Sequence, residues 1–483
     1  MASSTGSKLA KILAQMFDQS GFQGHAASTI IPNGISLLFQ KQMTKGFTVI
    51  LVLVLVVLAV LAVPFAVSTH SALAFDPQPA TIGTATPITV RIANLHGIRH
   101  AVAWIQQDSA VFPLTEENQP AKRFVFRRAP APPQNVAFNA GKEKAPTLKE
   151  GKARIVFEAQ SNDFRAATDR IFTDVTVILR PPSVVSDGFQ HYINQGGSEL
   201  AILTPGGSWT EAGVRVGDRH FRSFPFPGDP ARRFALFAYS WNTPTATAPA
   251  VYAKNAVGTE ASAQFWFKVF PKKVRLRNLE IDDQFLEKVV NDIDPGGSGD
   301  LLTHFLKING EMRRENDKTL SDLRFKTGEK FLWNQSFLQL ANSKVESAFA
   351  DVRSYMYKGK KVDQQTHLGF DLSTTLHHPV VAANSGRVVW AQRLGIYGNC
   401  IVIDHGYGLQ SIYGHLSELE VKDGDMVARG QEIGRSGSTG LAGGDHLHFS
   451  MQVDGMQVNP LEWWDEHWIK DHMRIRLPLP TAQ

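Results

Sequence analysis

The clearest hydrophobic pattern in the chain is an unbroken apolar run near the N-terminus. Residues 46–75 contain no Asp, Glu, Lys or Arg, and 16 of the residues from 47 to 67 are Leu, Ile, Val or Phe. A helix of this length crosses the roughly 30 Å hydrocarbon layer of a bilayer. We therefore predict a transmembrane helix over residues 47–67, preceded by an N-terminal tail over residues 1–46.

Basic residues are distributed unevenly around this run. Lys8, Lys11, Lys41 and Lys45 precede it, whereas no Lys or Arg follows it until Arg91. By the positive-inside rule the tail is cytoplasmic and the rest of the chain lies outside. The tripeptide at 72–74 resembles a signal-peptidase site, but the long leader and long apolar core are more typical of an uncleaved anchor.

After the membrane segment, apolar and polar residues alternate in short runs separated by Pro, Gly and Asn. The runs cover residues 88–92, 123–127, 155–157, 175–179, 200–203, 234–239 and 265–269. Such spacing is typical of antiparallel β-sandwiches, and residues 252–259 resemble the penultimate hairpin of bacterial Ig-like domains. We predict two β-sandwich (Ig-like) domains, at 75–182 and 183–272. They are interpreted as a spacer, with a wall-binding or partner-binding role as the alternative.

Residues 273–344 show a helical period instead. One apolar stripe consists of Phe285, Leu286, Val289, Val290 and Ile293, and a second consists of Leu301, Leu302, Phe305 and Leu306. The Pro-Gly-rich segment at 295–299 separates the two stripes. We predict a helical linker that packs beside the following domain, with a lid over that domain's groove as the alternative.

Composition narrows the choice of partners. With 483 residues the chain is too long for one core, and its 39 Gly and 25 Pro agree with turn-rich β structure. The net charge of +5 favours anionic surfaces such as lipid headgroups or wall polymer. Because the basic residues are dispersed, nucleic acid is not an expected partner. Cys400 is the only cysteine, which excludes an intrachain disulfide, and its apolar context predicts a buried thiol.

Candidate chemistry is concentrated between residues 367 and 448. The segment His367-Leu-Gly369-Phe-Asp371 places its polar residues on one face of an extended strand, and His446-Leu-His448 does the same. Gly369 leaves room for an ion beside the first segment. Two imidazoles and one carboxylate suit catalytic zinc, whose fourth position is left to water.

These segments, with Tyr413-Gly-His415-Leu, resemble the lysostaphin/LytM type of zinc metallopeptidase, peptidase family M23. Further matching pieces are found at residues 379–382, 386–389, 398–399, 403–406, 423–427 and 436–440. The resemblance covers about residues 345–465, and we predict a peptidase domain at 345–470, followed by a tail at 471–483. This chain has Phe349-Ala350 where the family usually has Phe-Gly, a departure in the domain's first turn.

The resemblance implies an antiparallel β peptidase domain in which His367, Asp371 and His448 bind Zn²⁺. It also implies that His415 and His446 stay off the metal and serve proton transfer or oxyanion binding. Which of the two is the base stays open. Tyr413, on the same strand, is a weaker candidate for substrate contact. His377, His378 and His405 are expected to lie away from the metal.

The expected function is therefore zinc-dependent hydrolysis of peptide cross-links in bacterial peptidoglycan, of the D,D-endopeptidase kind. The anchor suits an inner-membrane protein with its catalytic domain in the periplasm. Two alternatives remain: a non-enzymatic LytM-type activator of other wall hydrolases, and an anchored envelope scaffold. In either case the sandwich domains are candidate contact surfaces for envelope proteins.

Overall fold

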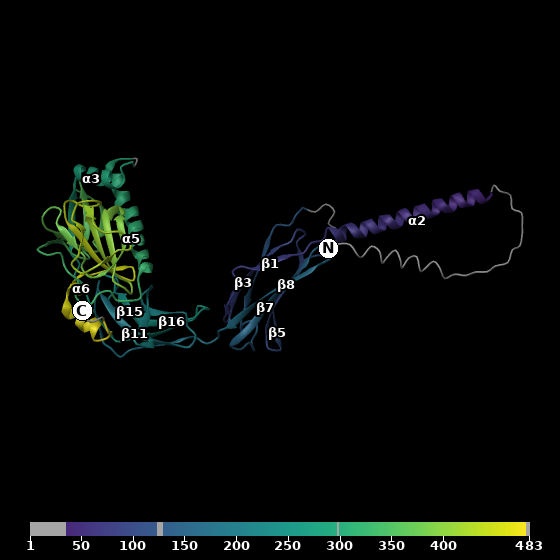
Figure 1. Cartoon of the computed structure of the whole chain (residues 1–483), viewed down its shortest axis with the longest axis horizontal. Helices are drawn as coiled ribbons and strands as arrows, with labels where there is room; N and C mark the ends of the chain where they lie inside the picture. The colour runs from purple at the N-terminus through teal and green to yellow at the C-terminus, as the bar shows by residue number, and fades with distance from the viewer. Residues whose placement is uncertain (1–34, 123–128, 297–298, 480–483) are drawn as a thin grey trace. The chain divides into compact units, whose positions relative to one another are not determined.

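A computed structural model describes residues 35–122, 129–296 and 299–479, with side chains described from residue 47 onward. It is mainly β with one long apolar helix near the N-terminus, as predicted (Figure 1). That helix, α2 (Ile35–Ala66), contains the segment Phe47–Ala66, which is long and apolar enough to cross a membrane. The described residues divide into two compact units, of which the second holds residues 80–86, 141–152 and those from 175 onward, and the first holds the others.

Two sheets follow the helix, and their strands match most of the predicted alternating runs. One sheet has the order β1-β3-β6 and the other the order β2-β8-β7-β4-β5. The predicted strand at 123–127 lies outside the described residues. The strands are β1 (Ala72–Phe75), β2 (Thr81–Ile82), β3 (Thr86–Ala93), β4 (Ile98–Gln107), β5 (Ala110–Asn118), β6 (Gln134–Ala140), β7 (Gly151–Ser161) and β8 (Thr168–Val177).

The next set of strands forms two four-stranded sheets and a parallel pair. Their orders are β14-β15-β11-β9, β13-β12-β16-β17 and β10-β18. The hairpin expected near residues 252–259 is formed by β16 and β17. The strands are β9 (Ser183–Ser186), β10 (His191–Asn194), β11 (Ser198–Gly206), β12 (Glu211–Val216), β13 (Arg219–Arg222), β14 (Phe224–Phe226), β15 (Asp229–Ala238), β16 (Ala250–Lys254), β17 (Glu260–Gln264) and β18 (Phe267–Phe270).

The segment predicted as a helical linker begins with a strand, which differs from the prediction. This strand, β19 (Leu276–Ile281), pairs in parallel with β21 (Val352–Tyr357). The helices then follow the predicted stripes: in α3 (Asp283–Ile293) the buried residues are Leu286, Val289 and Val290. The remaining helical elements are α4 (Leu301–Lys307), a π-helical turn (Ile308–Met312), α5 (Arg313–Asp322) and a 3₁₀ turn (Leu323–Lys326).

An eight-stranded sheet dominates the C-terminal region. It has the order β20-β23-β31-β27-β26-β25-β29, with β32 paired to β31. Two three-stranded sheets, β19-β21-β22 and β24-β30-β28, accompany it. The strands are β20 (Lys344–Ser347), β22 (Lys360–Thr366), β23 (Phe370–Ser373), β24 (Pro379–Val381), β25 (Gly386–Arg393), β26 (Asn399–Asp404), β27 (Leu409–Leu416), β28 (Glu418–Leu419), β29 (Met426–Val427), β30 (Glu432–Arg435), β31 (Leu447–Val453) and β32 (Met456–Val458). A 3₁₀ turn (Gly395–Tyr397) lies between β25 and β26. Short helical elements follow β32, namely α6 (Leu461–Trp464), α7 (Glu466–Ile469) and a π-helical turn (Lys470–Arg474).

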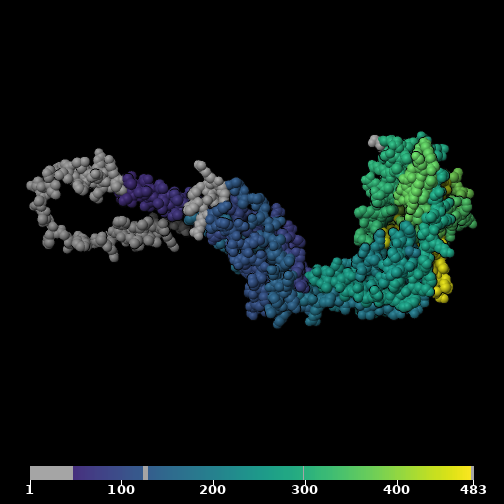
Figure 2. All heavy atoms as spheres, turned by 180° about the vertical axis from the view of Figure 1, so that it is seen from behind, coloured from purple at the N-terminus to yellow at the C-terminus, as the bar shows by residue number. Residues whose placement is uncertain are grey.

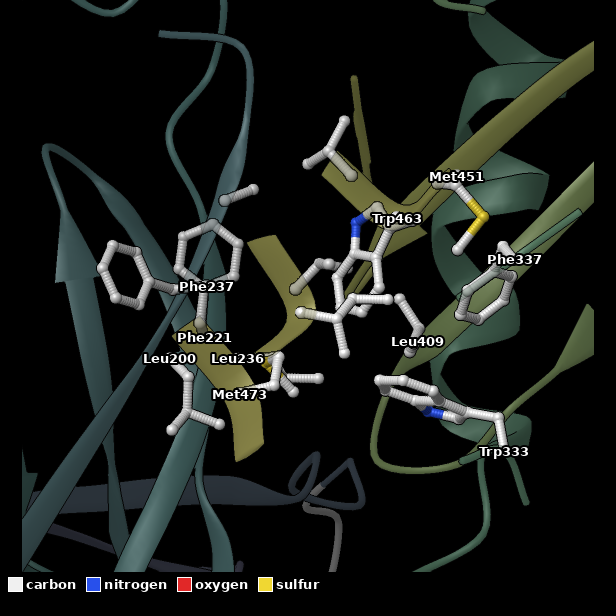
Figure 3. Close-up of a cluster of buried hydrophobic side chains, with 14 of the residues drawn as sticks. Leu200, Phe221, Leu236, Phe237, Trp333, Phe337, Leu409, Met451, Trp463 and Met473 are labelled. Carbon is white, nitrogen blue, oxygen red and sulfur yellow. The ribbon is translucent and has the colours of Figure 1, made fainter. Parts of the chain in front are cut away.

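One hydrophobic core runs from the second set of strands into the C-terminal region. Figure 3 shows side chains of β11, β13 and β15 on one side of it, with Met473 beside them, and Trp333, Phe337, Leu409 and Met451 on the other. Trp463, on α6, is fully buried between them. In the space-filling view the two parts adjoin (Figure 2). The labelled members are Leu200, Phe221, Leu236, Phe237, Trp333, Phe337, Leu409, Met451, Trp463 and Met473.

Charged side chains also join these two parts. Arg222, on β13, donates from Nε to Asp454 Oδ1 at 2.8 Å, and Asp454 follows β31. Glu462, on α6, accepts hydrogen bonds from Ser198 N at 2.7 Å and from Asn194 Nδ2 at 2.9 Å. Because both carboxylates are buried, separating the two parts would leave them without these partners.

Candidate active site

Two adjacent strands bring the metal-ligand candidates together. Asp371 on β23 and His448 on β31 are directly opposite each other in an antiparallel ladder. His367 lies in the short turn between β22 and β23, where its backbone N–H donates to Asp351 O at 2.9 Å. The sequence predicted that two polar faces would meet, and the strand register brings them together.

Three side-chain atoms form a small triangle. Asp371 Oδ1 lies 2.9 Å from His367 Nε2 and 3.1 Å from His448 Nδ1, and these two nitrogens lie 3.0 Å apart. Ligand atoms around tetrahedral zinc, with bonds of about 2.0–2.1 Å, are separated by roughly 3.3 Å. The donor set and its spacing therefore fit a zinc ion.

Hydrogen bonds behind the triangle determine which ring atoms face it. His367 Nδ1 donates to Ala348 O at 3.1 Å, so its Nε2 carries the lone pair that faces the triangle. His448 Nε2 is buried and has no hydrogen-bond partner. Nδ1 is therefore the polar atom through which His448 interacts here. A group of residues that could hold a metal ion is formed by His367, Asp371 and His448.

Gly369 is required by close packing at this point. A Cβ atom added there would lie 2.6 Å from the His448 ring and 2.7 Å from Phe449 O. The sequence suggested that this glycine leaves room for an ion. In the structure it leaves room for the imidazole of a candidate ligand, since a side chain at 369 would displace β31.

Two further imidazoles stand beside the triangle. The centroid of the His415 ring is 4.9 Å from that of His446 and 5.7 Å from that of His448. His415 Nδ1 donates to Thr439 O at 2.8 Å, and His446 Nδ1 donates to Gly444 O at 2.8 Å. In His415 the Nε2 atom is left for other groups, whereas Nε2 of His446 lies 3.5 Å from Asp371 Oδ1.

His415 is held in an unusual backbone conformation. Its φ of 64° lies in the left-handed region, which side-chain-bearing residues seldom adopt. The β26–β27 ladder shifts register next to it, between Asn399 and Ile401, as at a β-bulge. Bulges commonly redirect side chains beside active sites, and strain of this kind persists only where its surroundings enforce it.

Burial and mutual charge set the ionisation of this cluster. Burial by itself would raise the pKa of Asp371, but the charge and hydrogen bonds of the surrounding imidazoles hold it well below its usual value. Burial lowers the pKa of His367 to about 4, and burial together with His446 and His448 lowers the pKa of His415. Asp371 outweighs burial at His446 and raises its pKa.

The five residues line one cavity of about 690 Å³. Much of its remaining wall lies outside the segment 367–448, in which the sequence analysis predicted the site. Residues of β19, α3, α5 and β21 contribute, including Arg277, Lys288, Arg313, Asp317 and Arg353. Periodicity could not identify these residues, because their proximity to the site arises from long-range pairing.

Helix α3 is bonded to the loop that precedes β31. Lys288 Nζ donates to Ser438 O at 2.6 Å and also to Ala442 O, and Asp292 accepts from Gly440 N at 2.5 Å. The same loop contains Thr439, whose carbonyl oxygen accepts the hydrogen bond from His415. The helical segment therefore supports one wall of the cavity.

His377, His378 and His405 do not line the cavity, as expected. His405 is fully buried and bonds Ser385 O and Ser411 Oγ, each at 2.8 Å. His377 and His378 lie between β23 and β24, where His377 Nδ1 is 3.0 Å from Ser417 Oγ.

Two other residues singled out from the sequence are buried. Tyr413 is only 1% exposed and its hydroxyl accepts from Ala383 N at 2.8 Å, so the expectation that it contacts substrate was wrong. Burial raises the pKa of the Cys400 thiol, which agrees with an unreactive core cysteine.

Comparison with known proteins supports the assignment of this region. Residues 365–460 match the model of peptidase family M23. The chain is 41% identical over 96 residues to peptidoglycan DD-endopeptidase ShyA of Vibrio cholerae, and 38% identical over 95 residues to DD-carboxypeptidase/endopeptidase Mpg of Neisseria meningitidis. Each match covers 20% of this chain and 22% of the relative, so the likeness is confined to one domain.

Solved structures give similar matches. The catalytic domain of lysostaphin from Staphylococcus simulans is 31% identical, and the match covers 27% of this chain and 98% of that one with a TM-score of 0.24. A zinc-containing peptidase from Vibrio cholerae is 17% identical, with 64% and 81% covered and a TM-score of 0.25. The match to the family model, together with the identities to named relatives, leads to one conclusion: the C-terminal region of this chain contains a peptidase M23 domain.

Proposed function

We propose that this domain is a zinc-dependent endopeptidase that hydrolyses peptide cross-links of bacterial peptidoglycan. The observation that carries the proposal is the convergence of three candidate ligand atoms and two further imidazoles on one cavity. The substrate class is supported by relatives named as peptidoglycan endopeptidases. A D,D cross-link is the bond we assign, by similarity to those relatives.

We place the chain in the inner membrane with α2 as an uncleaved anchor. Residues 1–46 then lie in the cytoplasm and the M23 domain in the periplasm, as the lysine asymmetry around residues 47–67 indicates. We assign the regions 75–182 and 183–272 to sandwich domains, 273–344 to a supporting segment and 345–470 to the peptidase.

In this proposal His367, Asp371 and His448 hold the zinc. When bound, zinc supplies Lewis acidity that activates water and polarises the scissile carbonyl. The two Nε2 atoms of His415 and His446 are the groups left to exchange protons with water and with the leaving amine. The hydrogen bonds from their Nδ1 atoms keep both rings oriented for this role.

The alternative function is that of a non-enzymatic activator of other wall hydrolases. Such a protein would need neither a complete ligand set nor a pair of oriented imidazoles. All five residues are present here, and they line one cavity. This arrangement favours the enzyme over the activator and over an envelope scaffold.

Two nearby histidines provide the test: His448, which lies on β31, and His446, which comes just before that strand. His448→Ala removes a ligand, so zinc is expected to be lost on dialysis and hydrolysis of purified peptidoglycan to stop. His446→Ala keeps the ligand set, so about one zinc per chain should remain while hydrolysis falls on the order of 10² to 10⁴-fold. His377→Ala, an exposed histidine outside the cavity, serves as the matched control.

Metal content is measured by mass spectrometry of the purified full-length protein, and wall fragments are identified by their masses. A wild-type protein that binds zinc but releases no fragments would overturn the enzymatic proposal in favour of the activator. Zinc loss in the His446 variant with retention in the His448 variant would reverse the ligand assignment.

A further inference from the structure

Arg353 contacts one of the candidate ligands from outside the matched family segment. It lies on β21, upstream of residues 365–460, and its Nη2 is 2.5 Å from Asp371 Oδ2. The two side chains are only 19% and 12% exposed. A charge-assisted hydrogen bond between such poorly hydrated groups is stronger than one at the surface.

The two oxygens of Asp371 therefore have separate partners. Oδ1 faces the nitrogens of His367, His448 and His446, at 2.9, 3.1 and 3.5 Å, whereas Oδ2 faces the guanidinium group. A carboxylate can give a metal one oxygen or both. With Oδ2 bonded to Arg353, only Oδ1 remains for an ion.

We infer that Arg353 is a positioning residue that restricts Asp371 to one-oxygen coordination of the metal. One carboxylate oxygen and two imidazoles leave the fourth position of a tetrahedral ion open, as a catalytic site requires. If Oδ2 also bound, that position would be crowded. The inference rests on the proposed zinc-dependent function, since it describes how one ligand of that site is oriented.

The backbone of Arg353 is well placed for this role. β21 is the central strand of its sheet, and Arg353 is opposite Arg277 on one neighbouring strand and Gln365 on the other. Its position relative to Asp371 therefore does not depend on a free loop. The fork of N–H donors in arginine also suits a carboxylate better than the single ammonium of lysine.

Cobalt substitution provides a direct test in the full-length protein. Four-coordinate Co²⁺ absorbs visible light strongly, and the absorption weakens when further ligand atoms join. We expect Arg353→Met to bind one Co²⁺ with clearly weaker absorption than the wild type. Hydrolysis is expected to fall about 10–100-fold, as for other residues that orient a metal ligand, mainly in kcat. Arg353→Lys should recover part of both signals.

Arg275→Met is the matched control. Arg275 forms a more exposed bridge to Asp351, just before β19, and Asp351 is not in the candidate ligand set. Asp351 contacts His367 only through its backbone carbonyl, which the substitution leaves in place. This variant should keep the wild-type cobalt spectrum. Folding of each variant is checked by circular dichroism, and if Arg353→Met does not fold, Arg353→Gln is measured in its place against the same expectation.

The outcomes separate this inference from the proposed function. If the wild type binds no Co²⁺, the zinc-dependent function itself fails. If the wild type binds Co²⁺ and the uncharged variants at 353 give the same spectrum and kcat, only the role of Arg353 is overturned. A spectrum that changes equally in Arg275→Met would also overturn it, because the effect would then belong to the sheet.

Discussion

Glu462 should make the stability of the protein depend on pH. This residue of α6 is 5% exposed, and its carboxylate accepts from Asn194 Nδ2, Ser198 N and Ser198 Oγ. Burial raises its pKa, Glu199 adds to that effect, and the hydrogen bonds only partly oppose it, so the value is about 7. The same carboxyl group in the unfolded chain titrates near 4.5.

The sign follows from which state holds the proton. Between pH 4.5 and 7 the folded protein keeps this proton more often than the unfolded chain does, so raising the pH favours unfolding. The contribution of Glu462 to stability is therefore fully present below pH 4.5 and is lost as the pH rises through 7. The difference between the two pKa values corresponds to about 3 kcal/mol.

Glu462→Gln removes the titration and keeps a side chain of nearly the same shape. The free energy of unfolding is measured by urea denaturation, followed by tryptophan fluorescence, at pH values from 4.5 to 8.5. The wild type should lose about 3 kcal/mol relative to the variant across this range. In the control Glu466→Gln, which changes a more exposed glutamate nearby, the free energy of unfolding should vary with pH as it does in the wild type. Parallel curves for Glu462→Gln and the wild type would refute the reasoning.

Three further predictions concern other contacts. Lys288→Met should increase hydrogen exchange in residues 436–445 and reduce hydrolysis, because the loop before β31 loses two hydrogen bonds from α3. Unchanged exchange would show that this loop is ordered without the contacts of Lys288. Arg222→Met should lower the free energy of unfolding by about 3 kcal/mol, because the buried Asp454 carboxylate loses its charged partner and keeps only the hydrogen bond from the backbone N–H of residue 222; calorimetry measures this, and a loss below 1 kcal/mol would contradict it. Alkaline phosphatase fused after Gln483 should be active only if that end lies outside the cytoplasm, as we expect.

The sequence predicted the parts of the site that depend on local patterns. Alternation indicated that His367 and Asp371 share one face and that His446 and His448 share another, and the resemblance to family M23 selected His367, Asp371 and His448 from these four. The left-handed conformation of His415 could not be predicted, because it depends on a register shift between β26 and β27. Tyr413 was misjudged for a related reason, since its environment depends on what covers the sheet.

Contacts that arise only from tertiary pairing could not be predicted from the sequence either. Arg353 lies 18 positions before Asp371, and nothing in its neighbourhood marks it as a partner of that carboxylate. Glu462 lies in a short Leu-Glu-Trp-Trp segment that could equally be exposed. The strand β19 was hidden because a parallel pairing with β21 leaves no hairpin signal for a pattern to reveal.

The continuous core has a practical consequence for dissecting the protein. A fragment cut at residue 345, where the resemblance to the peptidase family begins, would lack Trp333 and Phe337 and would expose Trp463 and Met473 to water. Large exposed apolar patches promote aggregation. The smallest fragment expected to remain soluble and monomeric therefore begins near residue 183, and loss of activity in a shorter one would reflect misfolding before it reflected chemistry.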